Sequence, residues 1–124
     1  MSPEELPEFL CAACEALDDK KAEDITVLHF GPDGPIADDF IIATGTSEPH
    51  LRALVKSVEA CLDKQGMEYI SAQRGLRTGW VVIDAHDLVV HVFTKDMRRY
   101  FNLEGLWKDA RRVDFAPAAA AVRG

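Results

Sequence analysis

Residues 80–107 read WVVIDAHDLVVHVFTKDMRRYFNLEGLW, and this stretch decides the class of fold that the sequence predicts. Two apolar runs, 80–84 and 88–94, surround a short acidic turn, which is the pattern of a β-hairpin. Short helical turns are expected to follow around residues 97–101 and 103–109. The stretch therefore predicts two paired strands that lead directly into a helical segment.

Two amphipathic helices are expected outside this stretch, with signals at their ends. The first is expected over residues 3–18, with Ser2 as its N-cap and Pro3 at its first helical position. The second is expected to begin after Ser47, which is a good N-cap residue. Gly66 lies where a helix commonly ends in the left-handed conformation.

The remaining strands are predicted from their apolar runs. Residues 24–30 and 39–44 have strong strand character, residues 67–73 have weaker strand character, and Gly75 and Gly79 bracket an expected mobile loop. Helices and strands in this order predict an α/β fold, in which a mixed sheet is flanked by helices.

The length and composition are those of one ordinary globular domain. The chain has 124 residues, of which 48% are hydrophobic and 28% charged. We expect a single domain over residues 1–113 and a flexible C-terminal tail over residues 114–124. No apolar run approaches the roughly 18–20 residues that span a bilayer, the acidic N-terminus does not resemble a signal peptide, and three cysteines suit a reducing compartment. A cytoplasmic protein without a membrane segment is therefore expected.

The net charge of −7 is concentrated in the first part of the chain, where residues 1–46 hold eleven Asp and Glu against two Lys. Such an acidic surface suits a basic protein partner, and it equally serves solubility. The basic residues between Lys95 and Arg112 are mixed with acids, which is unlike a nucleic-acid footprint. No sequence-specific nucleic-acid binding is expected.

Two motifs could carry chemistry, and for each a structural interpretation is favoured. Cys11 and Cys14 form a CxxC pair inside the first helix without a second pair to complete a zinc site. The turn Gly45-Thr46-Ser47 could hold a phosphate at a helix N-terminus, but the paired aspartates of a nucleotidyltransferase do not follow it. No metal or cofactor is expected, and a nucleotide-binding or nucleotidyltransferase-type enzyme is kept as the alternative.

The aromatic and charged residues of 80–107 favour a binding surface over a core. His91 could form an acid/base pair with Asp84 or Asp87, but without a nucleophile or metal set a structural or interface histidine is favoured. Arg98 and Tyr100 are difficult to place in a core together with Trp107, and these residue types are common at protein interfaces.

The chain resembles the ribosomal silencing factor family (RsfS, also called Iojap-like) over about residues 20–109, most of its length. No single motif is specific, but their order and spacing are. In sequence they are KAEDI (21–25), ADDFIIATGTS (37–47), GWVVID (79–84), VVHVF (89–93) and RRYFNLEGLW (98–107).

This resemblance implies a translation repressor that is not an enzyme. Members of the family bind a protein of the large ribosomal subunit on its intersubunit face and sterically block association with the small subunit. Their fold is similar to the nucleotidyltransferase fold without its catalytic metal ligands, and they are often homodimers when free. This chain departs from the family at Ala85-His86, where Tyr-Gly is usual, and at Arg74, where an acidic residue is common.

The resemblance also implies which residues form or support the partner-binding surface. The acidic residues of this surface are expected to pair with basic side chains of the partner. Tyr100 and Trp107 are expected to anchor the interface, with Arg98 as a forked hydrogen-bond donor. The expected set is Trp80, Asp84, Asp87, His91, Arg98, Tyr100, Leu103, Glu104 and Trp107. A general RNA-binding domain is a third, weaker alternative.

Overall fold

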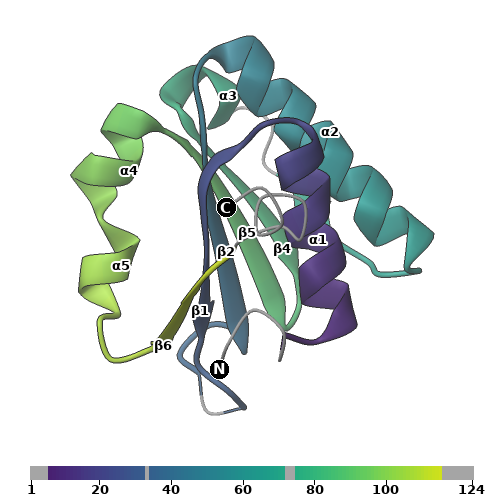
Figure 1. Cartoon of the computed structure of the whole chain (residues 1–124), viewed down its shortest axis with the longest axis vertical. Coiled ribbons are helices and arrows are strands. Elements are labelled where there is room, and N and C mark those ends of the chain that lie inside the picture. The colour runs from purple at the N-terminus through teal and green to yellow at the C-terminus, as the bar shows by residue number, and fades with distance from the viewer. Residues whose placement is uncertain (1–5, 33, 72–74, 116–124) are drawn as a thin grey trace, which may run out of the picture.

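The computed structural model describes residues 6–32, 34–71 and 75–115. Within these ranges the chain forms one mixed sheet with helices on both faces (Figure 1). The helices are α1 (Glu8–Asp19), α2 (Glu48–Lys64), α3 (Gly75–Thr78), α4 (Lys95–Phe101) and α5 (Leu103–Leu106). The strands are β1 (Glu23–His29), β2 (Asp39–Gly45), β3 (Ile70–Ser71), β4 (Trp80–Ala85), β5 (Leu88–Thr94) and β6 (Arg111–Asp114).

The sheet has the strand order β3-β4-β5-β2-β1-β6, and β2 and β5 at its centre are the only parallel pair among the described residues. Every residue of β2 is buried, as expected for a strand that is covered on both faces. The other neighbouring strands are antiparallel. This arrangement confirms the expected mixed α/β fold; the finer likeness to nucleotidyltransferases stays a prediction.

The helices α1 and α2 cover one face of the sheet and enclose the larger apolar core (Figure 1). Their buried side chains recur at helical spacing, so that each helix turns one stripe toward the strands. On α1 and α2 they are Leu10, Ala13, Cys14, Leu17, Leu51, Leu54, Val55, Val58 and Leu62.

The shorter helices α4 and α5 lie over the opposite face (Figure 1). A smaller core cluster lies there, and its fully buried members are aromatic or aliphatic side chains of the central strands, such as Phe40 and Phe93. Leu103 is the one buried residue that these two helices contribute. The second face is therefore covered only in part.

The expected hairpin is confirmed, since β4 and β5 pair from Trp80 and Phe93 to Ala85 and Leu88. The second helix is also confirmed at both ends. The Ser47 hydroxyl accepts the backbone N–H of His50, which satisfies one of the free donors of the first turn. After the helix, Gly66 has the left-handed φ of +72°.

The first helix begins later than expected, at Glu8, and Pro7 occupies its N-cap. The predicted cap at Ser2 and Pro3 lies outside the described residues. Of the weak strand over 67–73, only Ile70–Ser71 pairs, and residues 72–74 are not described. The expected loop between the two glycines contains the helical turn α3.

The prediction of secondary structure was wrong at the end of the chain, where it lacked β6. Residues Arg111–Asp114 pair antiparallel with β1, and Val113 is buried against the main core. Asp114, expected to begin the flexible tail, is thus the last residue of a strand. The part of that tail from residue 116 onward lies outside the described residues.

Candidate functional site

An exposed apolar surface lies on α4 and α5. Tyr100, Leu106 and Phe101 have 78%, 66% and 37% of their surface exposed, and no residue of α4 is buried. We call these three residues the α4–α5 surface. Large apolar side chains that stay exposed together are typical of protein docking sites, where they supply contact area once water is displaced.

Trp80 connects this surface to the sheet. Its ring stacks on Phe93 with the centroids 5.2 Å apart, and it contacts Phe101 of α4 at 4.4 Å. Its indole Nε1 donates a hydrogen bond to Nδ1 of His91 at 3.1 Å. Trp80 is half-buried and holds α4 in position from below, since it packs under Phe101.

His91 is a buried, neutral member of this aromatic layer. Its ring packs edge-on against Phe40 with the centroids 4.6 Å apart, and burial lowers its pKa to about 4. Because Nδ1 accepts from Trp80, the proton of the neutral ring is assigned to Nε2, and that buried atom has no partner among the described residues. His91 hydrogen-bonds to Trp80 and not to Asp84 or Asp87, which favours the structural interpretation over an acid/base pair.

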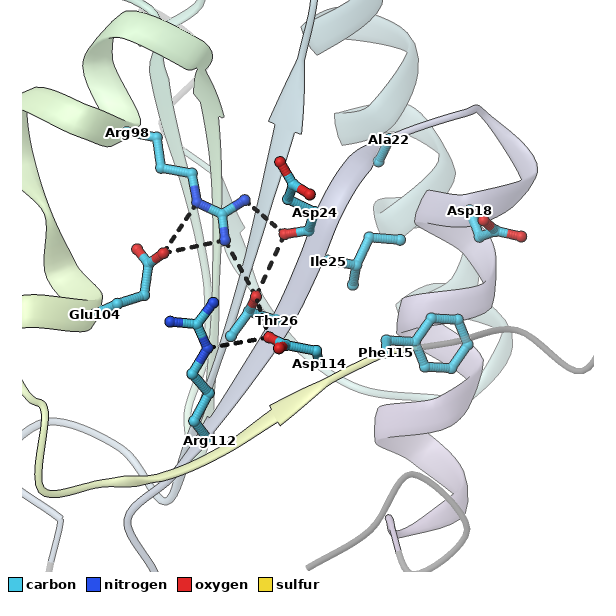
Figure 2. Close-up of a pocket in the computed structure, with 10 residues that line it drawn as sticks. All are labelled: Asp18, Ala22, Asp24, Ile25, Thr26, Arg98, Glu104, Arg112, Asp114 and Phe115. Atoms are coloured by element: carbon cyan, nitrogen blue, oxygen red, sulfur yellow. Dashed lines mark hydrogen bonds and ion pairs between the residues drawn. The ribbon is translucent and has the colours of Figure 1, made fainter. Parts of the chain in front are cut away.

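Arg98 fastens α4 and α5 to the sheet with all five of its N–H donors. Nη1 donates to the carbonyl of Asp24 at 2.6 Å and to the Thr44 hydroxyl at 2.9 Å. Nη2 donates to the Thr26 hydroxyl at 3.2 Å. Nε and Nη2 both donate to Oε2 of Glu104, at 3.3 and 3.2 Å, as Figure 2 shows. The guanidinium has no further donor to offer, so it joins α4, α5, β1 and β2 within the chain.

The end of this segment is fixed by Leu103 and Trp107. Leu103 is buried in the smaller cluster, and Trp107 is half-buried there. The Trp107 ring meets Phe40 and Phe30 edge to face, at centroid distances of 5.1 and 5.9 Å. Much of the indole is therefore used inside the chain, although part of it stays exposed.

Asp84 and Asp87 lie apart from the α4–α5 surface, at the turn of the β4–β5 hairpin. Both are exposed, and Oδ1 of Asp84 accepts the backbone N–H of His86, whose φ is +64°. At the usual rise per residue of a strand, Asp84 is about 13 Å along β4 from Trp80. The nine predicted residues thus form two groups: seven lie on or beneath α4 and α5, and Asp84 and Asp87 form an acidic pair at the hairpin turn.

Sequence reasoning missed the exposure of Phe101 and Leu106, and the roles of Phe30, Phe40 and Thr44 beneath the surface. The spacing FNLEGL gives a signal for the two exposed residues, because Leu103 takes the buried position between them. The contacts of Thr44 have no local signal, since it meets Arg98 across 54 positions of sequence.

The turn Gly45-Thr46-Ser47 is occupied by contacts within the chain. The Thr46 backbone N–H donates to Nδ1 of His50 at 2.9 Å, and Ser47 caps α2. Of the CxxC pair, Cys14 is buried, and burial raises the pKa of its thiol to about 12. Within residues 6–32, 34–71 and 75–115, no group of three or more His, Cys, Asp and Glu side chains is placed to hold a metal ion. None of the described helices is long and apolar enough to cross a membrane.

Comparisons with known proteins agree on one family. Residues 3–123 match the family model described as "Ribosomal silencing factor during starvation". Proteins named ribosomal silencing factor RsfS from Halalkalibacterium halodurans and Bacillus subtilis are 42% and 39% identical to the chain; each match covers 86% of it, and 92% and 90% of the relatives. A crystal structure of a protein from Chromobacterium violaceum superposes with a TM-score of 0.74 at 34% identity, covering 90% of this chain and 88% of that one.

Proposed function

Because the chain belongs to the family of ribosomal silencing factors, we propose that it represses translation by binding a protein of the large ribosomal subunit on the intersubunit face. The bound domain occupies space that the small subunit needs, so the two subunits do not associate. The observation that carries this proposal is the family match, which extends over residues 3–123.

The surface proposed for the ribosomal protein is the α4–α5 surface. Its exposed side chains supply the apolar contact area that the centre of an interface needs, and Trp80 and Trp107 extend that area as half-buried neighbours. Asp84 and Asp87 are proposed as an acidic rim toward basic side chains. His91, Arg98, Leu103 and Glu104 support the surface from within: three of them hold its helices or aromatic layer by hydrogen bonds, and Leu103 packs beneath α5.

The charge of the chain supports a basic partner. A net charge of −7 attracts the positively charged proteins of a ribosome and repels exposed phosphate backbones. The proposed action is steric, so it uses neither catalysis nor a cofactor, and it takes place in the cytoplasm. We further propose that the free protein forms a homodimer.

The direct test is co-sedimentation of the purified protein with isolated large subunits, small subunits and joined ribosomes. We expect binding to large subunits only, and inhibition of subunit joining in the same assay. If the folded protein does not bind large subunits, the proposal is refuted. Turnover of nucleoside triphosphate with magnesium by such a protein would favour the alternative enzyme.

The surface itself is tested with the double variant Tyr100→Ser, Leu106→Ser. We expect affinity for the large subunit to fall about tenfold or more, as for residues that anchor an interface. The matched control is Ile70→Ser, which changes a side chain that is 77% exposed on the edge strand β3. Equal affinity of the double variant and the control would remove the α4–α5 surface from the proposal.

Glu104→Arg would reverse the charge of a residue in the expected partner-binding set, but it does not test the contact with the ribosomal protein. The carboxylate of Glu104 is paired with Arg98, and their side chains are only 18% and 11% exposed. The guanidinium introduced at position 104 would lie against that of Arg98, and the repulsion would destabilise the fold. A loss of binding in this variant could therefore come from misfolding alone.

A further inference from the structure

A groove lies away from the α4–α5 surface, where the start of α1, the end of α2 and the turn of the β4–β5 hairpin meet. It consists of three adjoining cavities of about 450, 430 and 730 Å³. The first and second share Phe9 and Gln65 as lining residues, and the second and third share Met67, Glu68 and His86. We call these three cavities together the hairpin groove. Together they exceed the usual volume of a small-ligand site, so the groove suits a segment of polypeptide better than a small molecule.

The floor of the hairpin groove is apolar. Ala85 and Leu88 of the hairpin line it and are themselves buried, and Phe9 and Met67 line it as half-buried side chains packed against the main core. At the far end of the groove, Ile70 of β3 is 77% exposed. A partner that covers such a floor is stabilised there, because apolar area is removed from water. The floor therefore favours an occupant with apolar side chains.

The rim of the hairpin groove is acidic. No Lys or Arg is among the described residues that line it, whereas five exposed carboxylates are: Glu8, Asp63, Glu68, Asp84 and Asp87. Within the part of the chain that the structure describes, none of the five forms an ion pair with a Lys or Arg side chain. Such a rim repels the phosphate groups of lipids and nucleic acids and attracts cationic side chains. Only Asp84 and Asp87 also belong to the acidic rim proposed for the ribosomal protein.

We propose that the hairpin groove binds a segment of another protein in which apolar side chains are flanked by lysine or arginine. The apolar side chains cover Phe9 and Met67, and the cations pair with the carboxylates of the rim. Floor and rim are both needed, because an apolar floor does not select a partner by charge and exposed carboxylates alone hold a cation only weakly in salt. The proposal goes beyond the proposed function and does not depend on it, since binding in the groove is tested without ribosomes.

The test is a titration of the full chain at 150 mM salt, followed by amide NMR shifts. The probes are three acetylated and amidated peptides of equal length, with the sequences KLLKKLLKKLLK, ELLEELLEELLE and KSSKKSSKKSSK. We expect saturable shifts of the amides of Phe9, Met67 and Leu88 with the first peptide, which should bind about tenfold or more tighter than the other two.

Three outcomes overturn the proposal. The first is the absence of saturable shifts with the lysine–leucine peptide. The second is equal or tighter binding of the acidic or the serine peptide, which would mean that charge complementarity or the apolar floor is not used. The third is a shift of the same amides when the concentration of the protein alone is raised, which would assign the groove to a second copy of the chain.

Glu68→Lys tests the rim, because this exposed side chain lines two of the three cavities. We expect affinity for the lysine–leucine peptide to fall about fivefold or more, while the circular dichroism spectrum is unchanged. The matched control is Asp109→Lys, an equal change of net charge at an exposed position outside the groove, and it should bind as the wild type does. Wild-type affinity in Glu68→Lys, or an equal loss in both variants, contradicts binding in the groove.

Ile70→Ser tests the floor and separates this site from the α4–α5 surface. We expect the peptide to bind about threefold or more weakly to this variant, because an exposed apolar contact is lost. The matched control is Leu106→Ser, a change of similar size at a residue that is 66% exposed on α5, and it should bind as the wild type does. Equal affinity of the two variants, or weaker binding to Leu106→Ser, would contradict binding in the hairpin groove.

Discussion

The two faces of the sheet are covered in different ways. On one face, α1 and α2 contribute nine buried side chains, and the core there is almost entirely aliphatic. On the other, α4 and α5 contribute only Leu103, and the layer beneath them is aromatic. On the first face, close packing holds the helices on the sheet. On the second face, the hydrogen bonds of Arg98 and of the Trp80–His91 pair help to hold them.

The difference shows how a small domain can combine a stable fold with an exposed apolar surface. Burial of aliphatic side chains by α1 and α2 supplies stability, since it removes apolar area from water. Directional polar contacts then position α4 and α5 without burying Tyr100 or Leu106. We therefore expect substitutions of buried side chains to act on folding, and those of the exposed side chains Tyr100 and Leu106 on the second face to act mainly on binding.

The largest expected effect is that of Leu54→Ala, which truncates a fully buried side chain of α2. The lost transfer free energy and the cavity that remains should lower the free energy of unfolding by about 4 kcal/mol. Urea denaturation measures this effect. The matched control is Leu106→Ala on α5, 66% exposed, which should cost less than about 0.5 kcal/mol. Similar losses in both variants would mean that the two faces do not differ in this way.

Arg98→Ala should have the next largest effect, about 3 kcal/mol of unfolding free energy. The substitution leaves the mostly buried carboxylate of Glu104 without its counter-charge, and a broken buried pair is costly. In the double variant Arg98→Ala, Glu104→Ala, part of the loss should be recovered, because no unpaired charge remains. Strict additivity of the two single losses in a double-mutant cycle would argue against this coupling.

His91 should make the stability of the protein depend on pH. The unfolded chain takes up a proton at this residue near pH 6.5, but the folded chain does so only near pH 4, because the ring is buried. Acidification between these values therefore stabilises the unfolded state, and the free energy of unfolding should fall by about 2 kcal/mol from pH 7 to pH 5.

The variant His91→Asn removes this titration and keeps an acceptor near the position of Nδ1 for Trp80. Denaturant midpoints of both proteins, measured across the same pH range, isolate the contribution of the residue. Between pH 7 and pH 5, the free energy of unfolding should fall by about 2 kcal/mol less in the variant than in the wild type. Parallel curves for the two proteins would show that His91 is not held neutral by the fold.

Tyr100→Ser should have the smallest effect on folding, within about 0.5 kcal/mol, because the residue is 78% exposed. The same change should weaken binding to the large subunit severalfold, which thermal unfolding and co-sedimentation measure side by side. A marked loss of stability with unchanged binding would place Tyr100 in the fold instead of the interface.

The sequence predicts best where patterns are local. The hairpin of β4 and β5 and the helix α2 follow from apolar periodicity and from Ser47 and Gly66 at the helix ends. By contrast, β6 has the sequence RRVD, in which only Val113 is apolar, and its pairing with β1 is a long-range contact. Such a charged edge strand has no local signal that separates it from a loop.

The predicted site illustrates the same limit. The residue types near α4 indicate a binding surface, but they do not show that Arg98 turns inward. Its partners Asp24, Thr26 and Thr44 are 74, 72 and 54 positions away in sequence, so no local pattern reveals them. Likewise the partial burial of Trp107 depends on Phe30, which follows β1, and on Phe40 in β2, and both are far from Trp107 in sequence.

The parallel pair at the centre of the sheet has a consequence for how the protein is made. β2 and β5 are joined through α2, β3, α3 and β4, so their pairing must close a long stretch of chain before any contact compensates the entropy lost. During synthesis from the N-terminus, β2 (residues 39–45) cannot pair with β5 until residues 88–94 have emerged from the ribosome. The pairing of β1 with β6 requires residues 111–114 and therefore comes later still. We therefore expect the domain to complete its core only after residues 111–114 have left the ribosome.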